Sequence, residues 1–184
     1  MADKLRHSTI RRVVTMKKLP DLLTLSRGLV AVVILYLGFV GERALEAVIL
    51  LTILGWTTDI LDGRLARKYH KPPTWIGERE FLFDMVMVFS GLAYLVMSGL
   101  IIAWLALVYI AVAAVFIAFF RSKMIMMSFA TPLVALPLIV ASVKAPRAAV
   151  WYLIWIVGAL MLDWSRFKGV VREFLDNAKK LAQR

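Results

Sequence analysis

Long apolar stretches separated by short polar segments run through most of the chain. A helix needs about 20 mainly apolar residues to cross the hydrocarbon core of a membrane. Six stretches approach that length, and each is predicted to form one transmembrane helix: residues 22–41, 44–67, 80–99, 101–120, 125–143 and 147–163. We therefore expect an all-α membrane protein with six transmembrane helices.

Both ends of the chain are polar and basic, and both are expected to form helices on the membrane surface. Residues 2–18 mix basic and apolar side chains, a pattern typical of an interfacial amphipathic helix on anionic lipid. A disordered basic arm is the alternative for this segment. Pro20 and Asp21 are expected to open the first transmembrane helix, because proline and acidic residues suit a helix N-terminus. Apolar residues at helical intervals between 167 and 181 predict a basic C-terminal helix.

The composition leaves little room for a separate soluble domain. Hydrophobic residues make up 61% of the chain and its mean hydropathy is +0.79, whereas a soluble domain is nearer half apolar. We expect a single membrane domain over residues 1–184. It would comprise a basic juxtamembrane helix at 1–19, a six-helix core at 20–164 and a basic C-terminal helix at 165–184.

The net charge of +11 follows the predicted membrane topology. Lys and Arg residues crowd the first 18 residues, the connection at 67–79 and the tail from residue 166, whereas the opposite connections carry few. Segments enriched in Lys and Arg are usually cytoplasmic. We therefore expect both termini and the 67–79 connection to face the cytoplasm. Membrane lipid, not nucleic acid, is the expected partner of these basic residues.

Few side-chain types are available for a metal site. The chain has no cysteine and only two histidines. Disulfides and thiolate sites are excluded, and a histidine-based zinc site is not expected. Any metal should therefore be a hard cation held by carboxylates.

Four acidic residues stand near the ends of predicted membrane helices, where charge is expensive. An Asp at a helix centre costs about 2.5–3.5 kcal/mol on insertion scales. Asp59 and Asp62 fall near the end of the second predicted helix, and Glu80 and Asp84 open the third. Since consecutive helical residues are about 100° apart, the members of each pair lie on one face of their helix. The two pairs can therefore converge across the short connection.

Convergent carboxylates repel one another unless protons, basic side chains or cations compensate them. Mg²⁺ or Mn²⁺ suits an all-oxygen ligand set and often bridges carboxylates to substrate phosphates. Gly63 and Ala66 share the face of Asp59 and Asp62 and leave room for a nucleotide or diphosphate. The alternative is that the acids only form ion pairs with basic residues at the membrane interface, namely Arg64, Arg67, Lys68 and Arg79.

The same residues resemble a family signature. Residues 59–67 read Asp-Ile-Leu-Asp-Gly-Arg-Leu-Ala-Arg and are followed by acids at 80 and 84. This is similar to the D-x2-D-G-x2-A-R-x8-G-x3-D-x3-D signature of the CDP-alcohol phosphatidyltransferases. Residues 20–27 also resemble the P-N-x-L-T-x-x-R opening of many members, with Asp21 in place of asparagine. Two positions depart from the signature, because the third acid is Glu80 and the glycine stands at 77 instead of 76.

The resemblance implies a membrane enzyme that transfers a phosphatidyl-type group from a CDP-linked lipid, such as CDP-diacylglycerol, to an alcohol acceptor and releases CMP. It implies that Asp59, Asp62, Glu80 and Asp84 hold one or two Mg²⁺ or Mn²⁺ ions, and that Asp84 is also the general base. It further implies a homodimer with a cytoplasmic active site. The residues implied to border the CDP moiety are Thr24, Asp62, Gly63, Ala66, Arg67 and Gly77.

Two basic residues at the end of the fourth predicted helix suggest an acceptor class. Arg121 and Lys123 lie on the same predicted side of the membrane as the acids. They could bind a phosphate group on the acceptor, which favours a phosphorylated polyol such as glycerol 3-phosphate. Simple anchoring of the helix at the cytoplasmic face is the alternative reading of the same two residues.

Two other functions remain open from the sequence. A cation or proton transporter also keeps acidic residues inside the membrane, but its acids should follow a pathway, whereas these cluster at one face. A family member with altered Glu80 and Gly77 positions could instead bind a CDP-lipid without turnover. Release of CMP from added CDP-lipid would separate the enzyme from both.

Overall fold

The computed structural model describes the backbone of residues 2–68, 74–121, 123–164, 167–169, 171–172 and 174–176. Side chains are described from residue 19 onward within these ranges, except at positions 123 and 127. All regular structure in this part of the chain is helical. The elements are α1 (Ala2–Leu37), η1 (Glu42–Ala44), α2 (Leu45–Lys68), η2 (Gly77–Arg79), α3 (Glu80–Met97), α4 (Ala103–Phe120), α5 (Lys123–Lys144) and α6 (Pro146–Leu162).

The helices confirm the predicted all-α membrane class. Five helical segments are long and apolar enough to cross a membrane, and their bounds are Leu19–Leu37, Glu42–Lys68, Gly77–Met97, Ala103–Phe120 and Met124–Lys144. A sixth crossing is formed if Pro146–Leu162 is taken together with Phe167–Asp176, which turns away from it by 83°. The second to sixth predicted helices match α2 to α6 closely. Of the predicted C-terminal helix at 165–184, residues 165, 166, 170, 173 and 177–184 lie outside the described residues.

The first helix differs from the sequence prediction. Helix α1 is continuous from Ala2 to Leu37 and contains Pro20 in its interior. The apolar span does begin at Leu19, as predicted, but the helix does not, so the prediction that Pro20 lies at a helix N-terminus is wrong. A proline inside a helix removes one backbone hydrogen bond, but membrane helices tolerate this where other groups satisfy the freed carbonyl. The surface location of residues 2–18 stays a prediction.

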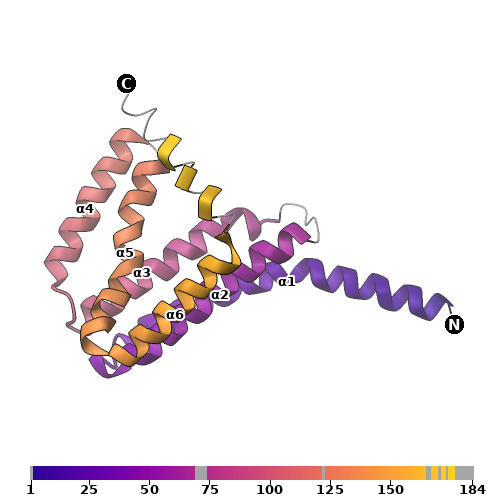
Figure 1. Cartoon of the computed structure of the whole chain (residues 1–184), viewed down its shortest axis with the longest axis horizontal. Coiled ribbons are helices and arrows are strands. Elements are labelled where there is room, and N and C mark those ends of the chain that lie inside the picture. Colours follow the sequence, from indigo (N-terminus) through magenta and orange to yellow (C-terminus); the bar gives the residue numbers. More distant parts are fainter. Residues whose placement is uncertain are drawn as a thin grey trace.

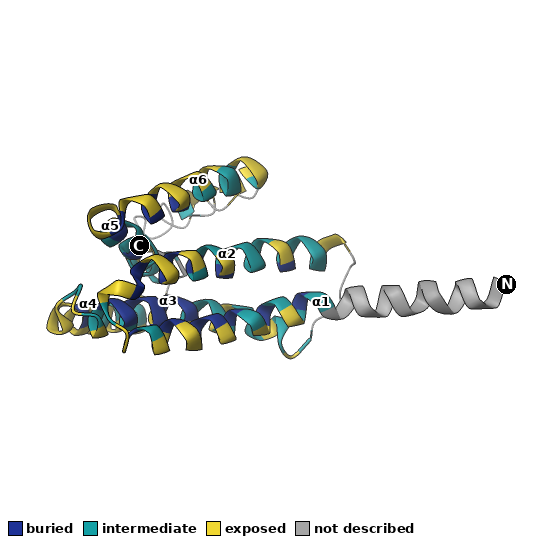
Figure 2. Ribbon diagram, turned by 90° about the horizontal axis from the view of Figure 1, so that it is seen from below, coloured by how far each residue is buried: buried dark blue, intermediate teal, exposed yellow. Residues whose placement is uncertain are grey.

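Helices α1, α2 and α3 pack together and form the centre of the molecule. Their core lies toward the end away from the N-terminus, where Figure 2 shows most of the buried positions. Ile34, Ile49 and Tyr94 are almost fully buried there. Small residues such as Ala141 and Ala149 bring α5 and α6 against this core, since small side chains allow membrane helices to approach closely.

The same end is fixed by a hydrogen bond across the bundle. Gly41 has φ of +83° in the turn between α1 and α2, a backbone conformation that favours glycine. The Tyr94 hydroxyl of α3 donates to the Gly41 carbonyl oxygen at 3.1 Å. Asp59 and Asp62 lie near the opposite end of α2, and Glu80 lies at the opposite end of α3. Helices α4 and α5 stand to one side of this group (Figure 1), and most residues of α4 are exposed.

Candidate active site

Three of the predicted acids converge where α2 ends and α3 begins. Asp59 and Asp62 lie in the last turns of α2, and Glu80 is the first residue of α3. One carboxylate oxygen from each of these three residues lies within 4.8 Å of the other two. Asp62 is only 3% exposed, whereas Asp59 and Glu80 are half-buried. Such a group of oxygens can hold a cation.

A close contact between α2 and α3 helps to bring these acids together. Gly55 is buried one turn before Asp59 on α2. A Cβ atom at this position would lie 2.3 Å from the Met87 sulfur of α3. The absence of a side chain at Gly55 therefore leaves room for the Met87 side chain of α3 near the acidic residues.

Arg27 of α1 lies among the acids and is fully buried. Its Nη1 donates to Asp59 Oδ1 at 2.5 Å and also to Asp84 Oδ1, and its Nη2 donates to Asp62 Oδ2 at 2.6 Å. Asp84 joins the other acids through this guanidinium, since it is not one of the three residues whose oxygens converge directly. One arginine thus connects α1, α2 and α3.

Sequence reasoning quoted Arg27 only as part of the opening motif and gave it no role in the site. A signal was available, because Arg27 is a charged residue inside an apolar stretch that spans the membrane from Leu19 to Leu37. A charge in such a position usually faces the bundle interior and has a partner of opposite sign. The missing information was which face of α1 meets the acids.

Two further contacts connect the start of the membrane-spanning part of α1 with the acidic residues and the following loop. Thr24 is buried, and its hydroxyl oxygen lies 3.0 Å from Asp62 Oδ2. Asp21 Oδ1 accepts a hydrogen bond from the Thr74 hydroxyl at 2.8 Å. The Thr74 oxygen in turn accepts from the backbone N–H of Gly77 at 3.1 Å. Gly77 is thus held beside α1, directly before α3.

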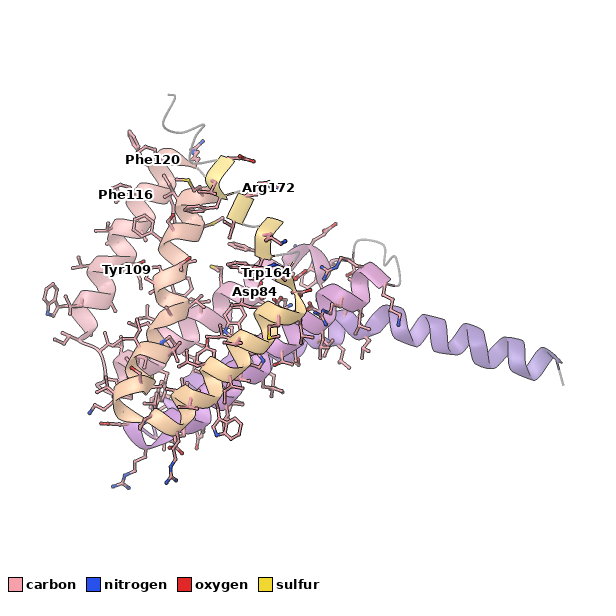
Figure 3. The ribbon with its side chains drawn as sticks, viewed as in Figure 1. Asp84, Tyr109, Phe116, Phe120, Trp164 and Arg172 are labelled. Atoms are coloured by element: carbon pink, nitrogen blue, oxygen red, sulfur yellow. The ribbon has the colours of Figure 1, made fainter. Side chains whose placement is uncertain are left out.

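The remaining predicted site residues have different surroundings. Gly63 and Ala66 are half-buried, and Arg67 is exposed. Arg121 is exposed at the end of α4, with φ of +44°. Figure 3 shows Asp84 in the middle of the molecule and Phe120, which precedes Arg121, well apart from it. The Lys123 side chain lies outside the described residues.

The expected ion pairs with neighbouring basic residues are replaced in part by longer-range ones. Three of the four acids pair with Arg27. Arg64 instead donates to Asp163 at 3.2 Å and to the Leu162 carbonyl oxygen at 2.8 Å. It therefore ties the end of α6 to α2, beside the acids. The alternative from the sequence, in which the acids form ion pairs only with Arg64, Arg67, Lys68 and Arg79, is therefore wrong.

The residues present suit a divalent cation. Asp62 Oδ1 is buried and accepts no hydrogen bond from the described residues, although buried carboxylate oxygens normally have a partner. Arg27 brings one positive charge to a group of four carboxylates, so negative charge remains in excess. Hard oxygen ligands and excess negative charge are the conditions that Mg²⁺ or Mn²⁺ requires.

An apolar groove begins at the acidic residues and runs between α2, α5 and α6. It encloses about 580 Å³ and has Asp59 in its lining. Ile60, Val134, Leu138 and Ile156 contribute to its mostly apolar wall. An elongated apolar group could therefore lie in the groove with its polar end at the carboxylates.

A family model described as CDP-alcohol phosphatidyltransferase matches residues 17–171. The matched range covers most of the chain and includes Arg27 and all four acids. Searches among curated proteins and among solved structures return no match. The matched range therefore contains both the apolar helices and the acidic residues.

Proposed function

Because the chain belongs to the CDP-alcohol phosphatidyltransferase family, we propose that it transfers a phosphatidyl-type group from CDP-diacylglycerol to an alcohol acceptor and releases CMP in phospholipid synthesis. The main support is the convergence of Asp59, Asp62 and Glu80 at the ends of two apolar helices, with Asp84 joined to them by Arg27. Catalysis at this position would act on the headgroup of a lipid whose chains stay in the membrane.

Asp59, Asp62 and Glu80 would hold one or two Mg²⁺ or Mn²⁺ ions, with Asp84 as a further ligand. The family generally depends on divalent metals, and the orphaned Asp62 Oδ1 fits such a role. When bound, the metal would neutralise negative charge that develops on the donor's phosphates during displacement. The longer side chain of Glu80 supplies the same carboxylate group as the family's aspartate.

Asp84 is the proposed general base. It accepts the proton of the acceptor hydroxyl while the acceptor oxygen forms a bond to the lipid-linked phosphorus. The bond from that phosphorus to the bridging oxygen breaks, and CMP leaves with the electron pair. A positioned base typically contributes about 10²–10⁴ in rate.

The donor would lie with its nucleotide toward the polar end of the bundle and an acyl chain toward the lipid. Thr24, Asp62, Gly63, Ala66, Arg67 and Gly77 are the residues proposed to border the CDP moiety. The apolar groove that starts at Asp59 is consistent with a lipid-linked substrate, because an acyl chain placed there continues directly from the carboxylates. A nucleotide without a lipid would leave this groove unused.

The acceptor is proposed to be a phosphorylated polyol such as glycerol 3-phosphate. Arg121 and Lys123 would bind its phosphate, since guanidinium and ammonium groups are strong phosphate partners. This assignment rests on their charge and their predicted side of the membrane, because Figure 3 shows the end of α4 apart from Asp84. By its basic residues the site would face the cytoplasm, together with both termini. A homodimer is also proposed, and the largely exposed apolar surface of α4 offers area for helix packing.

The test is CMP release by the purified full chain with CDP-diacylglycerol and Mg²⁺. Glycerol 3-phosphate, inositol phosphate, serine and no acceptor would be compared, and CDP-glycerol would replace the lipid donor in a separate arm. We expect acceptor-dependent CMP release that requires the lipid donor and stops in EDTA. Asp84→Asn should lower the rate by about 10²–10⁴, while Asp176→Asn, an exposed change outside the site, should not.

Each other outcome has a defined meaning. Metal-dependent binding of CDP-diacylglycerol without CMP release would indicate a family member that binds the donor without turnover. Neither binding nor release, together with cation flux in sealed vesicles, would contradict the transferase and favour a transporter. An Asp84→Asn variant with undiminished release would contradict the base assignment alone.

A further inference from the structure

We propose that Arg27 is a positioning residue for the metal ligands. It holds one oxygen of each of Asp59, Asp62 and Asp84, and thereby keeps the other carboxylate oxygens assembled before a divalent cation binds. The inference rests on the proposed function and adds a residue from α1 to it. Arg27 itself is not expected to contact the reacting atoms.

The hydrogen bonds of Arg27 span the whole site. Nη1 bridges Asp59 of α2 and Asp84 of α3, and Nη2 reaches Asp62 of α2. The guanidinium therefore fixes the distance between the two helices that supply the acids. Because Arg27 is fully buried, water does not compete for these bonds as it does for a surface pair.

The donors are distributed unequally over the two oxygens of Asp62. Arg27 Nη2 donates to Oδ2, and the Thr24 hydroxyl oxygen lies 3.0 Å from the same atom. Oδ1 is also buried but accepts no hydrogen bond from the described side chains and backbone. The arrangement thus leaves one oxygen of a buried carboxylate available, and a cation is a partner that satisfies such a buried charge.

The geometry needs an arginine and not only a positive charge. Nη1 donates to Asp59 and Asp84 and Nη2 donates to Asp62, while Nε has no hydrogen-bond partner among the described residues. A guanidinium holds its donors in a rigid planar fork, whereas the lysine ammonium is a single point of charge on a flexible chain. Arg27→Lys therefore preserves the charge and removes the fixed spacing between donors.

A competing reading predicts the opposite effect on metal affinity. If Arg27 only substitutes for the cation, its removal would free carboxylate oxygens and strengthen metal binding. If Arg27 positions the ligands, its removal would let the carboxylates separate under mutual repulsion and weaken metal binding. The sign of the change therefore decides between the two roles.

The experiment measures Mn²⁺ binding by electron paramagnetic resonance on the purified full chain in detergent, without substrate. Arg27→Lys and Arg27→Gln would be compared with the wild type. Arg43→Lys provides the matched control, because Arg43 is exposed in η1, which precedes α2 at the opposite end of the bundle. Loss of a group that orients metal ligands typically weakens binding about 10–100-fold. We expect a weakening of this size for both Arg27 variants and none for the control.

Thermal unfolding gives a second readout. Mn²⁺ should raise the Tm of the wild type more than that of Arg27→Lys at the same metal concentration, because weaker binding stabilises less. If the Arg27 variants do not fold, Thr24→Val removes a neighbour of Nη2 without changing a charge. It should weaken Mn²⁺ binding several-fold, and unchanged affinity in this variant would overturn the inference.

Arg27 variants that bind Mn²⁺ as tightly as the wild type, or more tightly, would also overturn it. That result would leave the proposed function intact if the wild type still releases CMP. A wild type that neither binds Mn²⁺ nor releases CMP would instead overturn both proposals together.

Discussion

At the residue scale, Glu80 distinguishes this site from the family signature, which has an aspartate at each of the four acidic positions. We expect Glu80→Gln to raise the Mg²⁺ concentration needed for half-maximal CMP release about tenfold or more, because it removes a charged ligand while keeping the side-chain length. Glu80→Asp should have a smaller effect, since the carboxylate is kept. The measurement is a Mg²⁺ titration of the rate.

Glu78→Gln is the matched control for this titration. Glu78 lies in η2, two positions before Glu80, and is exposed. The same change of charge there should leave the Mg²⁺ dependence unaltered. An equal shift in both variants would mean that general surface charge, and not ligation by Glu80, sets the metal requirement.

The individual acids could be predicted from the sequence, but their shared partner could not. Asp59 and Asp62 are three positions apart and Glu80 follows a short connection, so helical periodicity alone suggests convergence. Arg27 is 32 positions before Asp59 and 57 before Asp84. No local period relates residues at such separations. Only the packing of α1 against α2 and α3 determines that the guanidinium reaches the acids.

At the element scale, Gly55 of α2 accommodates the Met87 side chain of α3. We expect Gly55→Val to destabilise the protein by about 1–3 kcal/mol, because added side-chain atoms collide with Met87. Separation of the helices should also weaken Mn²⁺ binding by Asp59 and Glu80. Thermal unfolding and Mn²⁺ titration in detergent would measure the two effects.

Gly158→Val separates this collision from the general effect of valine in a helix. A Cβ atom at Gly158 of α6 meets no other atom within 4 Å. Its replacement should therefore change stability only through the difference in helix propensity between glycine and valine. Equal Tm decreases in the two variants would contradict the role of Gly55 in helix approach.

Element boundaries were predictable to different degrees along the chain. Most edges of α2 to α6 follow the change from apolar to polar residues, which is why composition located them. The break between α3 and α4 instead falls at Ser98 and Gly99, with apolar residues on both sides. The continuity of α1 was not predictable in this way, because Pro20 and the basic residues before it favour a break. The apolar span begins at Leu19. The helix begins earlier, at Ala2, so its first part is not explained by the need to cross the membrane.

At the scale of the whole molecule, the absence of cysteine allows a direct test of orientation. Glu78→Cys and Arg43→Cys place single thiols at exposed positions near opposite ends of α2. A membrane-impermeant maleimide should label Glu78→Cys only in inverted vesicles and Arg43→Cys only in right-side-out vesicles. Both should react after the membrane is dissolved in detergent. The reverse labelling pattern would place the active site outside the cytoplasm.

The buried arginine also constrains how the chain enters the membrane during synthesis. An arginine at the centre of a lone membrane helix costs about 2.5–3.5 kcal/mol on insertion scales, and Arg27 lies within the first span. Its partner Asp84 is made 57 residues later, on the order of several seconds at ordinary translation rates. Until α3 emerges, the first helix has no complete set of counter-charges in lipid. We therefore expect the translocation machinery to retain α1 beside water or protein, so that the first three helices enter the bilayer together.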